Sequence, residues 1–285
     1  MSETITPISI SAVPAVPTIK LLTGRVLKLR SSFQNPINYY LPIGEQEIFL
    51  NAYLGKTIHL EFLGKIHCLG CNAIIKKSYQ QGYCYPCTQS LARCDICIVR
   101  PEKCHFSRGT CREPEWAKSH CFIPHIVYLA NTSGLKVGIT REPQIPTRWI
   151  DQGATEALPI LRVSNRHQSG LIEVMLKDHV NDKTNWRKML QGPSEPLDLF
   201  RERDELFNKA NLQHSDNTIE VLTNHDDYKL VYPVLEYPSK VNSLNIEKTP
   251  SIAGTLLGIK GQYLILDTGV LNIRNLSGLD IAFKA

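Results

Sequence analysis

All nine cysteines of the chain lie between Cys68 and Cys121, and their spacing predicts metal binding. The first four form two C-x-x-C pairs at the spacing of a zinc ribbon. Each pair closes a tight turn, and a hairpin that brings two such turns together completes a tetrahedron of thiolates around zinc. The predicted ligands of this first zinc site are Cys68, Cys71, Cys84 and Cys87.

A third C-x-x-C pair, Cys94 and Cys97, predicts a second site with four ligands. Cys104 and Cys111 continue an even spacing from Cys97, and we assign them to the other two positions. The spacing leaves several residues open for these two positions: Cys104, His105, Cys111, His120, Cys121 and His125. The alternatives are an iron–sulfur cluster, which also takes four thiolates, and a disulfide framework. The second is disfavoured because the odd count leaves one cysteine unpaired and no secretory signal precedes them. We therefore expect about two structural zinc ions per chain.

The composition is that of an ordinary soluble protein, with 42% hydrophobic and 21% charged residues. No apolar run approaches the ~20 residues that cross a membrane, so we expect a cytoplasmic protein with no membrane partner. The formal net charge is +5. Two four-thiolate zinc sites, each with a charge of about −2, would nearly cancel it. A basic surface that binds an anionic partner must therefore come from a local group of cations and not from the net charge of the chain.

A compact α/β pattern follows the cysteines. Residues 125–130 and 135–140 predict two strands around a turn at 131–134. Residues 147–152 predict a short helix, and residues 170–180 a clearer one with Leu171, Ile172, Met175, Leu176 and His179 on one face. The result is strand, turn, strand, a helix that carries Arg148 and a helix that carries Glu173.

This pattern resembles the GIY-YIG nuclease superfamily. Its two half-motifs look like Val127-Tyr128-Leu129 and Lys136-Val137-Gly138, and Arg148 and Glu173 fall at the positions of the helix arginine and the metal-binding glutamate. More closely, residues 57–190 resemble an uncharacterised bacterial family in which a cysteine-rich N-terminal part is followed by a GIY-YIG-like module. The residues that carry this closer match are Gly82-Tyr-Cys-Tyr-Pro-Cys87, Cys104-His105, Gly109-Thr-Cys-Arg112, Leu135-Lys-Val-Gly-Ile-Thr-Arg141, Arg148-Trp-Ile-Asp-Gln-Gly153 and Thr184-Asn-Trp-Arg187.

The superfamily resemblance implies a phosphodiesterase that uses one metal ion. Tyr128 would help to deprotonate the attacking water, Arg148 would neutralise the scissile phosphate, and Glu173 would hold one Mg²⁺ or Mn²⁺. Lys136 replaces the second tyrosine of the pattern; it can bind phosphate but relays protons poorly. A four-residue turn at 131–134 would put Tyr128 and Lys136 on opposite faces of the sheet, whereas one extra loop residue puts them on the same face. Catalysis needs the shared face.

The predicted fold class is α+β. A GIY-YIG-like module and a zinc-ribbon region are flanked by two antiparallel β segments. Neither segment is large enough to fold stably alone. We expect these two segments to pack together as one discontinuous β domain. The predicted segments are a disordered tail at 1–18, an N-terminal β segment at 19–67, a cysteine-rich zinc-binding region at 68–124, the GIY-YIG-like module at 125–215 and a C-terminal β segment at 216–285.

Three functional hypotheses follow. The first is a metal-dependent endonuclease that acts on DNA or structured RNA. The second is a zinc-containing nucleic-acid-binding protein in RNA processing or translation, which keeps the nuclease fold as a binding surface without cleavage. The third is a protein-interaction scaffold. For the nucleic-acid hypotheses we predict contacts from Arg141, from Trp186 by base stacking and from Arg187 to phosphate. Alternatively, Trp186 seals the core of the module.

Overall fold

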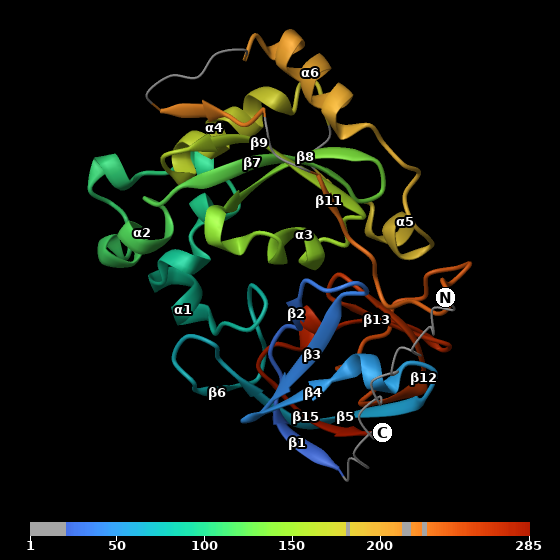
Figure 1. Ribbon diagram of the computed structural model, residues 1–285. Helices are drawn as coiled ribbons and strands as arrows, with labels where there is room; N and C mark the ends of the chain where they lie inside the picture. The colour runs from blue at the N-terminus through green and yellow to red at the C-terminus, as the bar shows by residue number, and fades with distance from the viewer. Residues whose placement is uncertain (1–20, 181–182, 213–217, 224–226) are drawn as a thin grey trace, which may run out of the picture.

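The computed structural model describes residues 21–180, 183–212, 218–223 and 227–285, so the predicted tail at 1–18 lies outside the described residues. The fold is α+β, as predicted. Figure 1 shows a lower β body, an upper α/β unit and a cysteine-rich segment along one side of both. Among the described residues, none of the helices combines the length and the apolar character that a membrane crossing requires.

The lower β body is built from both ends of the chain. Its strands are β1 (Leu22–Arg25), β2 (Arg30–Ser32), β3 (Asn38–Ile43), β4 (Gln46–Phe49), β5 (Thr57–His67), β6 (Ile74–Ile75), β12 (Ser251–Lys260), β13 (Tyr263–Leu266), β14 (Gly269–Asn272) and β15 (Leu279–Lys284). Seven of them form one sheet in the order β1-β15-β5-β12-β13-β14, with β6 beside β5, and β2-β3-β4 form a smaller sheet. In Figure 1 the blue and red strands interleave. The strands of the N-terminal segment therefore share one core with β12–β15. Residues 219–221 and 228–229, which the sequence placed in the C-terminal β segment, instead join the upper sheet.

The upper α/β unit is an antiparallel sheet in the order β10-β9-β7-β8, with β11 beside β9 and helices on both faces. Its elements are β7 (His125–Asn131), β8 (Leu135–Arg141), α3 (Thr147–Asp151), β9 (Glu156–Val163), α4 (Arg166–Leu176), α5 (Trp186–Leu190), α6 (Leu199–Ala210), β10 (Ile219–Val221) and β11 (Tyr228–Lys229). Side chains of β7 alternate between two cores. Val127 and Leu129 pack with residues of α4 and α6, whereas Tyr128 and Ala130 pack with Trp149 of α3 and with the β body.

Two elements differ from the prediction. Strand β9 was not predicted. Its Pro159 is unusual in a central strand, and a register shift opposite Val127 and Tyr128 accommodates it. Helix α4 begins at Arg166 rather than Gly170, because the side chain of Asn165 caps it by accepting a hydrogen bond from the backbone N–H of Gln168 at 3.0 Å. The predicted apolar face of this helix is therefore wrong in part: Ile172 and Leu176 are buried, but Leu171 and Met175 are exposed.

A buried polar contact fixes the α/β unit on the β body. The amide nitrogen of Gln262 donates to the Leu29 carbonyl at 3.1 Å and to Oδ1 of Asp151, at the end of α3, at 2.8 Å. Lys28 Nζ donates to Oδ2 of the same aspartate at 2.7 Å. Because buried polar groups need such partners, this contact sets the orientation of α3 and brings Lys28 close to Arg148 on the same cavity wall.

Candidate metal centre and basic cavity

Four cysteines meet where β5 ends. The sulfur atoms of Cys68, Cys71, Cys84 and Cys87 all lie within 4.8 Å of one another. Three of these residues are buried and Cys71 is exposed. Four thiolates at such distances suit tetrahedral coordination, so this cluster could hold a metal ion.

The two C-x-x-C pairs of this cluster are built differently. Cys68 opens a tight turn directly after β5, whereas Cys84 caps helix α1 (Tyr85–Ser90), its sulfur accepting a hydrogen bond from the backbone N–H of Cys87. The prediction of two similar turns joined by a hairpin is therefore wrong for the second pair. Gly70 lets the pairs approach, because a Cβ there would lie 2.9 Å from the sulfur of Cys87.

Backbone donors favour the thiolate form of Cys68. Its sulfur accepts from the N–H groups of Gly70 at 3.3 Å and Cys84 at 3.2 Å. Burial raises the pKa of the Cys68 thiol, but hydrogen bonds from the backbone of Cys71, Cys84 and Gly70 outweigh burial and lower the pKa to about 6. The thiolate is the metal-binding form, so Cys68 is ready to bind metal at neutral pH.

A second group of candidate ligands comprises Asp95, Cys97 and His105, whose ligand atoms lie within 4.8 Å of one another. The buried Asp95 carboxylate accepts from the backbone N–H of Cys97 at 3.2 Å and pairs with Arg112 Nε at 2.7 Å. This group also could hold a metal ion. The residues predicted for the second site that lie outside this group are Cys94, Cys104 and Cys111.

Two histidines that the sequence left open as ligands have other contacts. His120 stacks on Trp116 with ring centroids 4.1 Å apart. His125 is fully buried, and its Nδ1 lies 2.8 Å from the carbonyl of Ile123. Burial lowers the pKa of His125 to about 4, against the opposing effect of the hydrogen bond that the ring donates to the Ile123 carbonyl. The imidazole is therefore neutral and part of the packing.

Arg148 and Glu173 line one cavity of about 570 Å³ beside α3 and α4. Cations outnumber carboxylates on its wall. The cations are Lys28, Arg141, Arg148, Arg166 and Arg274, and the carboxylates are Asp151 and Glu173. Lys28 and Asp151 form an ion pair with each other, which leaves four arginines against Glu173 on the wall, so the field in this basic cavity is positive.

Tyr128 does not line the basic cavity. The residue is fully buried, and its hydroxyl donates to Oε1 of Gln152 at 2.8 Å and also contacts Arg148. Burial raises the pKa of Tyr128, and the nearby Arg148 guanidinium offsets this only in part. The phenol therefore stays protonated at neutral pH. It helps to position Arg148 from outside the basic cavity.

The strand register places Tyr128 and Lys136 on the same face of the sheet. Asn131 pairs with Leu135, Ala130 with Lys136, and Tyr128 with Gly138. The loop is thus one residue shorter than the predicted four-residue turn, which was wrong, and the shorter loop gives the shared face that catalysis requires.

Residues 55–281 match a family described as "Protein of unknown function (DUF2797)". The chain belongs to the DUF2797 family. The matched region covers the cysteine-rich segment, the α/β unit and most of the β body. The search of curated proteins and the search of solved structures each gave no match.

Sequence reasoning missed several residues of the basic cavity in this DUF2797 chain. Lys28 and Arg274 come from the N- and C-terminal β segments, and no local pattern marks them. Arg166 follows the Asn165 cap, and recognising that cap would have placed it on the first turn of α4. Of the three predicted nucleic-acid contacts, only Arg141 lines the basic cavity.

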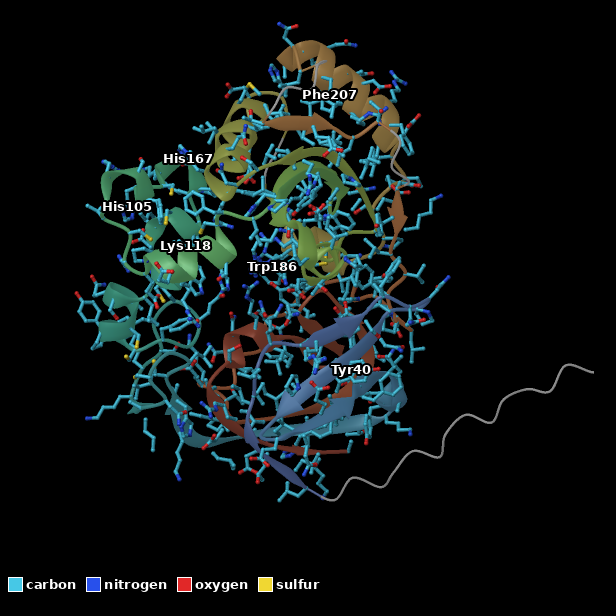
Figure 2. The ribbon with its side chains drawn as sticks, turned by 60° about the vertical axis from the view of Figure 1, so that its left-hand side comes forward. Tyr40, His105, Lys118, His167, Trp186 and Phe207 are labelled. Carbon is cyan, nitrogen blue, oxygen red and sulfur yellow. The ribbon has the colours of Figure 1, made fainter. Side chains whose placement is uncertain are left out.

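Trp186 packs against the β body. Its ring stacks on Tyr263 of β13, with centroids 5.6 Å apart and planes 3° apart, and the Arg187 guanidinium lies 4.2 Å from the centre of its ring. Figure 2 shows Trp186 between the upper α/β unit and the lower β body. This placement accords with the alternative that the tryptophan seals packed surfaces, and contact of Trp186 and Arg187 with nucleic acid stays a prediction.

We expect Gly138→Ala to destabilise the α/β unit and displace Tyr128. A Cβ at this position would lie 2.6 Å from the tyrosine hydroxyl oxygen, and overpacking of this kind costs about 1–3 kcal/mol. Denaturant titration measures the change in the free energy of unfolding. Gly192→Ala is the matched control, because no atom lies within 4 Å of its added Cβ. Equal stability of the two variants would contradict the close packing of Tyr128 on Gly138.

Proposed function

We propose that this DUF2797 protein binds the phosphodiester backbone of nucleic acid in the basic cavity. The convergence of Arg141, Arg148 and Arg166 on one cavity carries the proposal. A guanidinium offers phosphate oxygens paired N–H donors in a fixed geometry. The formal net charge of the whole chain is only +5, so the positive charge that would attract phosphate is the local excess of cations on this cavity wall.

A neighbouring cavity of about 790 Å³ extends this basic surface along the cysteine-rich segment. The two cavities share the residues Lys28, Ile98, Val99 and Arg274. Arg93 adds a further cation to the wall, and the side chain of Val99 is largely exposed there. A continuous track with cations and exposed apolar groups suits an extended strand of nucleic acid better than a small phosphate compound.

We also infer that the cluster of Cys68, Cys71, Cys84 and Cys87 holds structural zinc, for which four thiolates are a common ligand set. The apolar cluster around it is small and consists of Cys68, Cys84 and Cys87 with partly buried Ile75, Tyr83 and Leu91. A core of this size needs a metal to hold it. Because Leu69 and Tyr83 line the neighbouring cavity, zinc would fix one wall of the binding surface.

A second candidate function is phosphodiester cleavage that depends on Mg²⁺ or Mn²⁺. It is favoured because Arg148 and Glu173 line the same cavity while the hydroxyl of Tyr128 contacts Arg148. Glu173 would hold the divalent ion together with phosphate oxygens, since Mg²⁺ takes few protein carboxylates. The bound ion would supply charge stabilisation at the leaving oxygen. Arg148 would hold the phosphate in place, with Tyr128 supporting the guanidinium.

Arg148→Ala tests the binding proposal. Loss of one phosphate contact is expected to weaken binding several-fold and to reduce the slope of log affinity against log salt by about one. Fluorescence anisotropy with tRNA, single-stranded RNA and single-stranded DNA over a range of salt concentrations measures both quantities. Arg201→Ala is the control, because that side chain is 75% exposed on α6 and lies outside the basic cavity. Equal affinities and slopes for the two variants would contradict the proposed site.

A further inference from the structure

A second cluster of cysteines lies in the part of the molecule that Figure 2 turns forward, where His105 is labelled. Four cysteines line one small cavity of about 20 Å³, room enough for one water-sized particle or ion. They are Cys97, Cys104, Cys111 and Cys121. The group of Asp95, Cys97 and His105 includes only one of them.

The four sulfur atoms are neighbours across this small cavity. Cys97 interacts electrostatically with Cys104 and Cys121, and Cys121 interacts with Cys104 and Cys111. Unlike the first four cysteines, they do not form a group within 4.8 Å of one another. Metal binding would therefore draw the short turns that carry Cys104 and Cys111 inward.

The polar groups beside the cavity already have other partners. His105 Nδ1 lies 2.8 Å from the hydroxyl of Thr110, and its Nε2 lies 3.4 Å from Oδ1 of Asp95. The other oxygen of Asp95 pairs with Arg112 at 2.7 Å. Asp95 and His105 are thus placed to support cysteine ligands from outside, as hydrogen-bonded partners of metal ligands do.

The segment around this cavity lacks a core of its own. All of residues 92–124 are described, and none of them belongs to a hydrophobic core cluster. Its helix α2 (Pro114–His120) is short, and the other helical elements of the segment are single 3₁₀ turns of three residues each. A segment of this kind needs a cross-link or a metal to hold one conformation.

Arg166 supplies an independent indication of negative charge at this cavity. Its guanidinium donates to the carbonyl of Ile98, its Nε is buried without a hydrogen-bond partner, and it interacts electrostatically with Cys97 and Cys121. Among the described residues, no carboxylate forms an ion pair with it. A buried cation needs a compensating charge, and a four-thiolate zinc site carries about −2.

We propose that Cys97, Cys104, Cys111 and Cys121 form a second structural zinc site. Each thiol releases its proton to solvent as the sulfur binds zinc. Cys94, which the spacing favoured, is not a ligand: it lines the larger neighbouring cavity and interacts with Cys68 of the first cluster. None of the four proposed ligands lines the basic cavity, so this site does not depend on nucleic-acid binding.

Zinc content of purified full-length variants tests this ligand set. Wild type is expected to contain about two zinc ions per chain, one at each four-cysteine site. Cys121→Ser should lose one of them, whereas Cys94→Ser, the control at a buried cysteine outside the proposed ligand set, should lose none. Elemental analysis with native mass spectrometry gives the counts. A Cys121→Ser protein with the wild-type zinc content, or a Cys94→Ser protein that has lost one ion, would overturn the proposal.

X-ray absorption of the wild-type protein gives a second test that does not depend on the folding of any variant. Zinc is expected to show a shell of sulfur only, with Zn–S distances of about 2.3 Å. Oxygen or nitrogen in the first shell would instead indicate Asp95 or His105 as ligands and would contradict the all-cysteine site. Iron with inorganic sulfide in the purified protein would overturn the assignment to zinc.

Discussion

Glu173→Gln is expected to abolish divalent-metal-dependent cleavage of nucleic acid while leaving binding intact. Glutamine keeps the shape of the side chain but removes the carboxylate that would hold Mg²⁺ or Mn²⁺. Metal stabilisation of a leaving oxygen contributes several kcal/mol, so the cleavage rate should fall by about 10³-fold or more. Affinity should hardly change, because the substitution removes a negative charge from a cavity that binds phosphate.

Cleavage of tRNA, other structured RNA and branched DNA, with and without Mn²⁺, measures this effect. Glu236→Gln is the control, because that glutamate is exposed and lies outside the basic cavity. If wild type binds nucleic acid but cleaves no substrate, and both variants bind equally, then cleavage is rejected and the binding proposal stands. If wild type and Arg148→Ala bind none of the nucleic acids, both proposals fail and a protein-interaction role becomes the leading hypothesis.

Cys84→Ser is expected to remove metal from the first cluster and to destabilise the cysteine-rich segment severely. Cys84 has two roles, since its sulfur caps α1 and belongs to the four-cysteine cluster. Serine is a good helix cap, so the substitution keeps the first role and removes the second. Structural zinc contributes about 10–16 kcal/mol of apparent binding free energy in zinc-finger peptides, so the loss should exceed that of an ordinary core substitution.

Thermal unfolding, read together with zinc content, measures the effect of Cys84→Ser. A chelator should lower the melting temperature of the wild-type protein at least as far as the substitution does. A soluble Cys84→Ser variant with wild-type zinc content and an unchanged melting temperature would show that the first cluster is not a structural metal site.

The sequence by itself determined the features that depend on neighbouring residues. Two C-x-x-C pairs bring four sulfurs together because each pair holds two cysteines close on a short stretch of chain, a turn for the first pair and the start of α1 for the second, and a short segment joins them. Composition predicted β7 and β8, since short runs rich in apolar and β-branched residues on either side of a turn favour two paired strands. Arg148 and Glu173 were predicted from the resemblance, and they line one cavity because both helices pack beside this hairpin.

Only the tertiary structure decided which distant residues meet. Lys28 and Arg274 reach the basic cavity because the two ends of the chain share one sheet, in which β1 pairs with β15 and β5 pairs with β12 and β15. The spacing grouped Cys94 with Cys97, but the turn between them sends their side chains to different cavities, and Cys121 arrives from the end of α2. Such contacts are set by long-range strand pairing and by the burial of whole faces, which leave no mark in a local pattern of residues.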